Sequence, residues 1–288
     1  MEVMMTHSWK PCEELAPYIE RYWFWESGAA QALPVLLPGT GNDLFIHFKR
    51  PFASIRSPAH LLCVRSRPWP LEPDGPTAFV AIRFRMGALR HFCRFEIGDL
   101  FDQAVSVEQL WGKEGGRWAE QVEMEFRYPR AIVILESQLL RWLRKYRRME
   151  AEIDRAATQL YYGHADCRVE DLVSSGRISR RQLERTFKSA MGLSPKAFQR
   201  LARFQQTVRD LLLVPSRGGL DTALAHGYYD QSHFIRDFES FAQVSPTAFL
   251  NRRNSMSHFY NPPGALSAIP ACTFMRNGNN GRKGGGTP

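Results

Sequence analysis

The sequence predicts an α+β protein with a mainly β N-terminal half and an all-helical C-terminal half. Residues 1–110 are rich in aromatic and β-branched side chains interrupted by Pro and Gly, which is typical of strands and turns. From residue 129 onward, apolar side chains recur at spacings of three and four, the period of an amphipathic helix. A chain of 288 residues is long enough for two domains of ordinary size.

Five strands and one helix are expected before residue 149. Short runs of apolar, aromatic and β-branched residues predict the strands Ile19–Glu26, Val35–Leu37, Leu44–Phe48, His60–Arg65 and Ala78–Arg85. A Pro- and Gly-containing turn at 38–43 separates the second strand from the third. The helix covers 129–146, with Pro129 near its first turn. The composition divides the chain into residues 1–149, a helical domain at 150–254 and a Pro-, Asn- and Gly-rich tail at 255–288 that we expect to be disordered.

The helical domain contains an internal repeat. Residues 176–198 align without gaps on residues 227–249, 51 positions later. Eight positions are identical in the two copies: Gly176, Arg185, Phe187, Ser189, Ser194, Pro195, Ala197 and Phe198 match Gly227, Arg236, Phe238, Ser240, Ser245, Pro246, Ala248 and Phe249. Two copies of one supersecondary unit are therefore expected.

Each copy reads as a short helix, a glycine turn, a second helix and a Ser-Pro start to a third. Gly176 and Gly227 supply the residue that tolerates a left-handed turn. Ser179 is the expected N-cap of the second helix in the first copy, and Gln182 completes a capping box. Asp230 takes the N-cap position in the second copy. Two helices joined by a tight glycine turn form the helix-turn-helix pattern.

The second helix of the first unit separates into an apolar face and a polar stripe. Its inward side holds Leu183, Phe187, Ala190 and Met191, and its stripe holds Arg181, Glu184, Arg185 and Lys188, with Arg180 at the helix start. On an isolated helix such a stripe is more often a solvated face. Within a capped helix-turn-helix it favours DNA, because Arg can pair with guanine and Glu can accept from cytosine.

The second unit is expected to be electrostatically the weaker of the two. Its inward side holds Phe234, Phe238 and Phe241, and its outer side holds Ser232, Ile235, Arg236 and Glu239. From Leu220 to Glu239, one basic residue stands against four acids, which are Asp221, Asp230, Asp237 and Glu239. Between Arg177 and Arg209, in contrast, nine basic side chains stand against the single acid Glu184. The first unit should therefore dominate DNA binding.

Charge, cysteine content and the positions of the histidines argue against several other classes of protein. The formal net charge of +9 fits a polyanionic partner. Five scattered cysteines without a CxxC pair predict neither a disulfide framework nor a zinc site and are typical of a cytoplasmic protein. No apolar run is long enough for a membrane span and no secretion signal is visible. His47 has no His-x-His partner or nearby acid, and His60 and His91 are isolated, so we expect no metal and no cofactor.

Residues 151–253 resemble the DNA-binding domain of the AraC family of bacterial transcription regulators. The most specific segments are 178–187 (ISRRQLERTF) and 227–234 (GYYDQSHF). The resemblance implies a seven-helix domain that binds double-stranded DNA with sequence preference. The base-reading positions that it implies are Arg181, Glu184 and Arg185 in the first unit and Gln231, Ser232, His233 and Arg236 in the second. Glu239 stands where the family usually has a basic residue.

The N-terminal half resembles poorly characterised sensory domains that are fused to some AraC-type regulators, through residues 37–44 and 83–88. This resemblance implies a mainly β, cupin-like domain with trailing helices that responds to an unknown small-molecule effector. The resemblance is also compatible with two protein partners, RNA polymerase and a second copy of the chain. The strand aromatics could line the effector pocket, although such side chains are more often core: Tyr18, Tyr22, Trp23, Trp25, Phe45 and Phe48.

Two other classes of protein remain as alternatives. A non-specific architectural DNA-binding protein would not need varied polar residues on its recognition helices. An enzyme such as a DNA-repair methyltransferase with an AraC-type appendage would need a reactive cysteine, and neither Cys12 nor Cys63 has suitable surroundings. We therefore expect no enzymatic activity.

Overall fold

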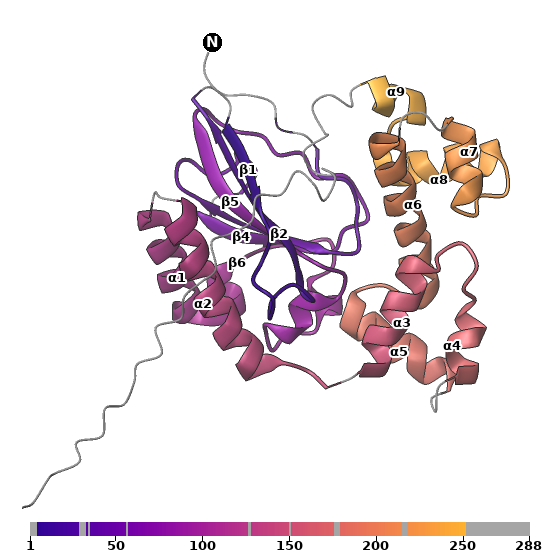
Figure 1. Cartoon of the computed structure of the whole chain (residues 1–288), viewed down its shortest axis with the longest axis horizontal. Coiled ribbons are helices and arrows are strands. Elements are labelled where there is room, and N and C mark those ends of the chain that lie inside the picture. The colour runs from indigo at the N-terminus through magenta and orange to yellow at the C-terminus, as the bar shows by residue number, and fades with distance from the viewer. Residues whose placement is uncertain are drawn as a thin grey trace, which may run out of the picture.

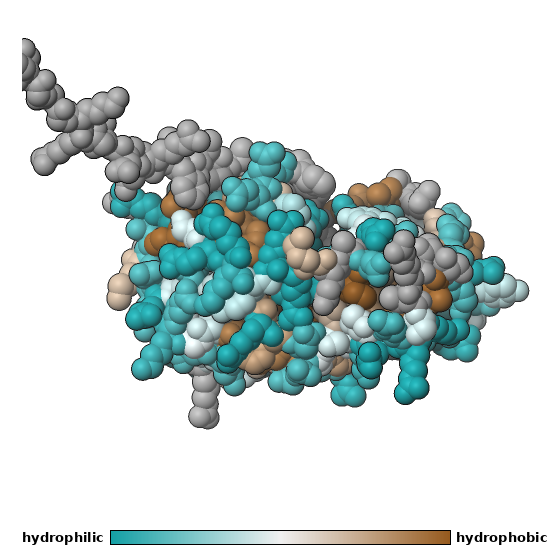
Figure 2. Space-filling view, turned by 90° about the horizontal axis from the view of Figure 1, so that it is seen from below, coloured by the Kyte–Doolittle hydropathy of each residue, from teal (hydrophilic) through white to brown (hydrophobic). Residues whose placement is uncertain are grey.

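The computed structural model describes residues 5–28, 33, 35–55, 57–125, 128–149, 151–175, 179–214 and 218–251. An antiparallel sheet with two helices against it lies beside a helical body built around one long helix (Figure 1). The expected disordered tail and the turn residue Gly176 lie outside the described residues. Within these ranges, no helix combines the length and the apolar character that crossing a membrane requires. The face shown in Figure 2 is mainly hydrophilic, with apolar residues in separate small patches.

Six strands form one antiparallel sheet in the order β1-β2-β5-β3-β4-β6. They are β1 (Met5–Trp9), β2 (Ile19–Ser27), β3 (Asn42–His47), β4 (Ala59–Leu62), β5 (Thr77–Phe84) and β6 (Ala104–Ser106). The central strands β3 and β5 are buried along nearly their whole length. Both faces of these two strands are buried, and this explains why their sequences are nearly continuous apolar runs and do not alternate between apolar and polar residues.

Four of the five expected strands are confirmed, with ends shifted by at most three residues. The expected strand Val35–Leu37 is wrong, because in this segment only Leu36 pairs, in a single bridge to Trp69. β1, β6 and the helix α1 (Val107–Met124) were missed. α1 contains three glycines, and Gly112 adopts a left-handed φ of 63°, so its local propensity for helix is poor.

Two helices cover one face of the sheet (Figure 1). Ser106 and Gln109 form a capping box at the start of α1, and α2 (Tyr128–Tyr146) follows with the apolar spacing that the sequence predicted. The helices meet through buried tryptophans, because the rings of Trp111 and Trp142 stack with centroids 4.0 Å apart. The short helices η1 (Ala88–His91) and η2 (Ile97–Leu100) connect β5 to β6.

The other face of the sheet holds a second apolar cluster with two buried histidines beside it. The rings of His47 and His60 stack with centroids 5.3 Å apart, so the expectation that His60 is isolated is wrong. Their four ring nitrogens have no hydrogen-bond partner among the described residues. Burial, together with the charge of His60, lowers the pKa of His47 to about 3. Burial also lowers the pKa of His60, to about 4.

We expect acid to destabilise the protein through this pair. In the unfolded chain both imidazoles take up protons below about pH 6.5, whereas in the folded chain both stay neutral until pH falls to about 4. The free energy of unfolding should therefore fall as the pH is lowered through this window. In urea titrations at several pH values, the free energy of unfolding of His47→Leu should fall less steeply with decreasing pH than that of the wild type. The exposed-site control His7→Leu should fall as steeply as the wild type. Equal slopes for the two variants would contradict this assignment.

Seven helices are described in the C-terminal half, the number that the resemblance implied. They are α3 (Ala151–Tyr162), α4 (Val169–Ser175), α5 (Arg180–Met191), α6 (Pro195–Leu213), α7 (Gly219–Ala225), α8 (Gln231–Ala242) and α9 (Pro246–Asn251). α3, α4 and α5 lie around one end of α6, and α7, α8 and α9 lie around its other end (Figure 1). The long helix α6 therefore carries one helix-turn-helix unit at each end.

Candidate nucleic-acid interface

The expected helix caps are present in both units. The side chain of Ser179 accepts from the backbone N–H of Gln182 at 3.3 Å, which is one half of the expected capping box. Asp230 accepts from the backbone N–H of His233 at 2.7 Å and so begins α8. Gly227 has the left-handed φ of 82° that its turn requires. These local interactions set the start of each second helix, and with it the side chains that face outward.

The face of α5 is divided as the sequence predicts. Leu183, Phe187, Ala190 and Met191 are buried, and Arg181, Glu184, Arg185 and Lys188 are exposed. Arg180 is also exposed, but its guanidinium pairs with Glu170 of α4 at 3.1 Å and with Glu184 at 3.2 Å. Because Arg180 offsets the charge of Glu184, the exposed surface of α5 keeps the positive charge of Arg181, Arg185 and Lys188.

The face of α8 differs in part from the expectation. Gln231, Ser232, Arg236 and Glu239 are exposed as expected. His233 is half-buried, with its ring against that of Tyr228 and its Nδ1 accepting from the backbone N–H of Tyr229 at 3.3 Å. Ile235, expected on the outer face, is half-buried against the core. The exposed polar surface of α8 is therefore narrower than that of α5.

Asp237, one of the four acids counted in the second unit, is buried with 4% exposure and so does not add to the charge of the exposed surface. It accepts from Nε of Arg200 on α6 and, at 2.9 Å, from the hydroxyl of Tyr228. The guanidinium of Arg200 also lies 4.8 Å from the ring centre of Phe241. The three-residue spacing between Phe234 and Asp237 was the signal for an inward position. On the exposed face of α8, one cation, Arg236, thus stands against one acid, Glu239.

The N-terminal half contacts the C-terminal end of α5 directly. The hydroxyl of Ser189 donates to Glu96 at 2.9 Å. A Cβ placed on Gly98 would lie 2.9 Å from the carbonyl oxygen of Lys188, so this approach requires glycine. The segment around η2 therefore contacts the C-terminal end of α5. No local sequence pattern indicated this contact.

A chain of hydrogen bonds joins the two units through two histidines. Nδ1 of His164, in the turn before α4, lies 2.9 Å from the carbonyl oxygen of Tyr161, and its Nε2 lies 2.8 Å from Nδ1 of His226. Nε2 of His226 lies 3.0 Å from Oδ2 of Asp210. The carbonyl and carboxylate oxygens can only accept, so each of the three hydrogen bonds needs an N–H group from one of the two imidazoles. Two neutral imidazoles carry only two N–H groups between them. The complete chain therefore requires one extra proton shared by the two imidazoles.

We expect a rise in pH toward neutrality to weaken this connection and, with it, the joint binding of the two units to DNA. Burial lowers the pKa of His164 below its usual value of 6.5, so the shared proton is lost as the pH rises toward neutrality; the charges that act on His164 are those of His226, Arg203 and Asp166. Loss of one hydrogen bond should reduce affinity for a duplex that engages both units about threefold to tenfold as the pH rises from about 5 to about 7. In fluorescence anisotropy, His226→Gln should flatten this dependence and His7→Gln should preserve it. A steep profile in His226→Gln would contradict the role of the pair.

Similarity to known proteins covers the two halves separately. Residues 173–252 match a family described as a helix-turn-helix domain, and residues 7–106 match a domain of unknown function, DUF6597. The HTH-type transcriptional regulator MtrA of Neisseria gonorrhoeae is 37% identical over 78 residues, which cover 27% of this chain and 26% of MtrA. An uncharacterized HTH-type transcriptional regulator of Haemophilus influenzae is 31% identical over 84 residues, 29% of this chain and 28% of that protein.

The chain thus spans about a quarter of the length of these two curated relatives. A solved structure of ToxT from Vibrio cholerae aligns with 87% of this chain and 98% of its own, with a TM-score of 0.47 and 12% identity. The matched helix-turn-helix residues contain α5 to α8, whose caps and faces are described above. The chain therefore carries a helix-turn-helix domain in its C-terminal half, and most of its N-terminal half is similar to a domain of unknown function.

Proposed function

We propose that this chain is a sequence-specific DNA-binding transcription regulator of the AraC type whose DNA binding responds to a small-molecule effector. The observation that carries the proposal is the position of two capped helix-turn-helix units at the two ends of α6. α6 has 19 residues, which corresponds to about 28 Å. Successive major-groove faces on one side of duplex DNA are about 34 Å apart, so α5 and α8 can enter consecutive grooves.

The exposed side chains suit base readout as well as phosphate contacts. In the first unit, Arg181, Glu184 and Arg185 are the proposed base-reading residues, with Arg180 and Lys188 beside them for phosphates. In the second unit the proposed set is Gln231, Ser232, His233 and Arg236, with His233 also packed on Tyr228. Varied donors and acceptors favour a specific sequence over the architectural alternative.

Selection from random duplexes tests this proposal on the full-length chain. We expect enrichment of one motif that is bound at least about a thousandfold more tightly than scrambled DNA at one salt concentration. Arg141→Ala, which removes a charge from an exposed site on α2, should leave that ratio unchanged. Salt-sensitive binding without sequence preference would instead support the architectural alternative.

The contact between the two halves supports a response to an effector. The segment around η2 contacts the C-terminal end of α5, and Thr40 donates to Gln205 of α6, so a change in the N-terminal half can reach both units. RNA polymerase and a second copy of the chain are the proposed protein partners, and the proposed domains are residues 1–149 and 150–254.

The environments of the cysteines favour a role without cysteine catalysis. Burial raises the pKa of Cys63 to about 12 and the pKa values of Cys12 and Cys93 to about 11. A thiol needs a lowered pKa to act as a nucleophile near neutral pH. These three thiols therefore do not suit the methyltransferase alternative, and the proposed regulator is not an enzyme.

A further inference from the structure

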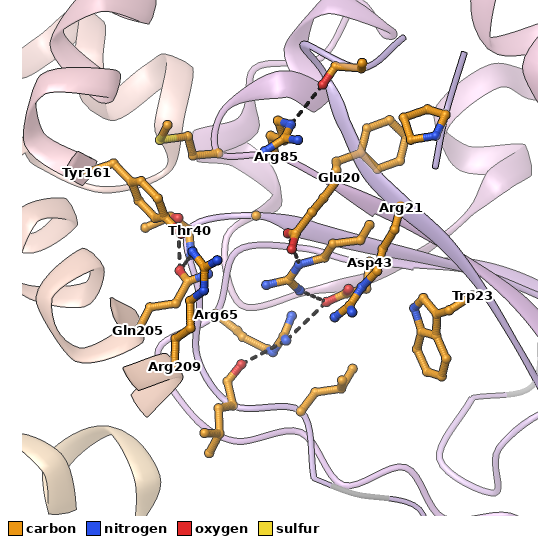
Figure 3. Close-up of a pocket in the computed structure, with 18 of the residues that line it drawn as sticks. Glu20, Arg21, Trp23, Thr40, Asp43, Arg65, Arg85, Tyr161, Gln205 and Arg209 are labelled. Carbon is orange, nitrogen blue, oxygen red and sulfur yellow. Dashed lines mark hydrogen bonds and ion pairs between the residues drawn. The ribbon is translucent and has the colours of Figure 1, made fainter. Parts of the chain in front are cut away.

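A cavity of about 360 Å³ lies between the sheet and the helical body. This volume is in the range of small-molecule sites, about 300–1,000 Å³. Residues of β2, β3, β5 and the segment 35–41 line one side, and Tyr161 of α3 with Gln205 and Arg209 of α6 line the other (Figure 3). Oε1 of Gln205 accepts from the backbone N–H of Thr40 at 3.0 Å and from its hydroxyl at 3.1 Å, which closes one edge. A molecule in this cavity would contact both halves of the chain.

Cationic side chains outnumber carboxylates among the described residues that line the cavity. The carboxylates are Glu20 and Asp43, and the cations are Lys10, Arg21, Arg65, Arg83, Arg85 and Arg209. Asp43 already pairs with Arg65 at 3.2 Å and with Arg83 at 2.5 Å, and Glu20 lies 3.8 Å from Arg83. Two carboxylates cannot balance six cations, so the cavity concentrates a positive potential that attracts anions.

The shape of the lining specifies the kind of anion. The planar guanidinium group offers paired N–H donors that match the oxygens of a carboxylate or a phosphate. Arg209 makes no hydrogen bond or ion pair to any residue in the described part of the chain, so its donors are available to a ligand. Trp23, Leu36 and Tyr161 add apolar and aromatic surface on which carbon atoms can pack. This combination fits an organic molecule with an oxyanion group better than an inorganic ion alone.

The glycines of the 38–43 turn allow the two halves to approach at this point. A Cβ on Gly39 would lie 3.2 Å from Nη2 of Arg83 and 3.4 Å from Oε1 of Gln205. A Cβ on Gly41 would collide with the carbonyl oxygen of Phe84. The turn therefore lies against both Arg83 and Gln205, and the cavity lies where α6 meets the sheet.

We propose that this cavity binds a small organic oxyanion, a carboxylate or a phosphate ester, between the arginines of the sheet and Arg209 of α6. This inference rests on the proposed function, because it names the class of effector and the place where it acts. α6 carries both helix-turn-helix units, so an anion that ties Arg209 to the sheet favours one orientation of both units relative to the N-terminal half. The bound oxyanion changes DNA affinity by shifting that orientation.

The first test measures thermal unfolding and calorimetric titration of the full-length protein without DNA. The probes are benzoate, succinate, glycerol phosphate and inorganic sulfate, each at the same ionic strength as a chloride reference. Benzamide, succinamide and glycerol are the neutral partners of the organic probes. At least one organic oxyanion should raise Tm and bind with saturation, and its neutral partner should do neither. Comparing the carboxylate probes with glycerol phosphate shows whether the cavity prefers a carboxylate or a phosphate ester. If no probe raises Tm above the chloride reference, the proposal is overturned.

Two matched variants locate the binding site. Arg209→Gln should weaken binding of the best probe about tenfold, as expected for the loss of one charge-assisted hydrogen bond. Lys196→Gln removes the same charge from an exposed position on the same helix outside the cavity and should leave binding unchanged. Equal loss in both variants would mean that net charge rather than the cavity attracts the anion, and would overturn the site.

DNA affinity, measured with and without the best probe, separates this inference from the proposed function. If the protein binds an oxyanion with saturation but binds no duplex with or without it, the proposed function is wrong and the anion site stands. Sequence-specific DNA binding without oxyanion binding would remove the site and keep the function. Oxyanion binding that leaves DNA affinity unchanged would overturn the regulatory part of the inference.

Discussion

Replacing Arg185 by Ala is expected to weaken binding to the preferred duplex about tenfold or more and to relax selectivity at one or two adjacent base pairs. Arg185 lies on the exposed stripe of α5, between Arg181 and Lys188. A bidentate pair between arginine and guanine contributes about 1–3 kcal/mol of discrimination, and about 1.4 kcal/mol corresponds to a factor of ten. Binding isotherms on specific and scrambled duplexes at one salt concentration measure both effects.

Arg236→Ala is the matched variant in the second unit, and its effect should be smaller and more even across sequences. Arg236 occupies the equivalent place in the repeat, but its Nε donates to the carbonyl oxygen of Ser232 in its own helix at 3.2 Å. The exposed acid Glu239 also lies on that helix face. Contacts to phosphate weaken binding nearly uniformly when they are lost. If Arg236→Ala proves the more damaging variant on the preferred duplex, the second unit leads recognition.

Asp43→Asn is expected to lower the free energy of unfolding by about 3–5 kcal/mol, because breaking a buried ion pair leaves its partners without a counter-charge. Asp43 is 1% exposed and accepts from both Arg65 and Arg83. Burial alone would raise the pKa of Asp43, but the charges of Arg83 and Arg65 outweigh burial and hold the pKa below its usual value. The stability from this carboxylate is therefore present at neutral pH and is lost as the pH falls below about 4.

Urea titration in chloride buffer measures this loss, with Glu26→Gln as its control. Glu26 is on the same sheet and pairs with Lys49 at 3.0 Å near the surface. Such exposed pairs contribute about 0–1 kcal/mol. A loss in Asp43→Asn no larger than that in Glu26→Gln would contradict the central position of Asp43 among the cavity arginines.

The helix-turn-helix units could be predicted from the sequence because the interactions that form them are local. The N-caps at Ser179 and Asp230, the left-handed turn at Gly227 and the apolar spacing of α5 all act within one or two helical turns. The same spacing placed Arg181 and Arg185 outward. Four strands also followed from short runs of β-forming residues. The base-reading roles of the exposed residues stay predictions until the binding experiments are made.

Tertiary structure decided the features that depend on contacts between distant segments. Asp237 is withdrawn from the DNA-binding face by Arg200, 37 residues away, and His164 meets His226, 62 residues away. Of the aromatics proposed for an effector pocket, only Trp23 is among the described residues that line the cavity, and it belongs to the second core together with Trp25 and Phe45. The cavity itself forms where Thr40 meets Gln205 across 165 residues. The local spacing of residues in the sequence does not predict such a contact, because its free energy is gained only after both segments have folded and packed together.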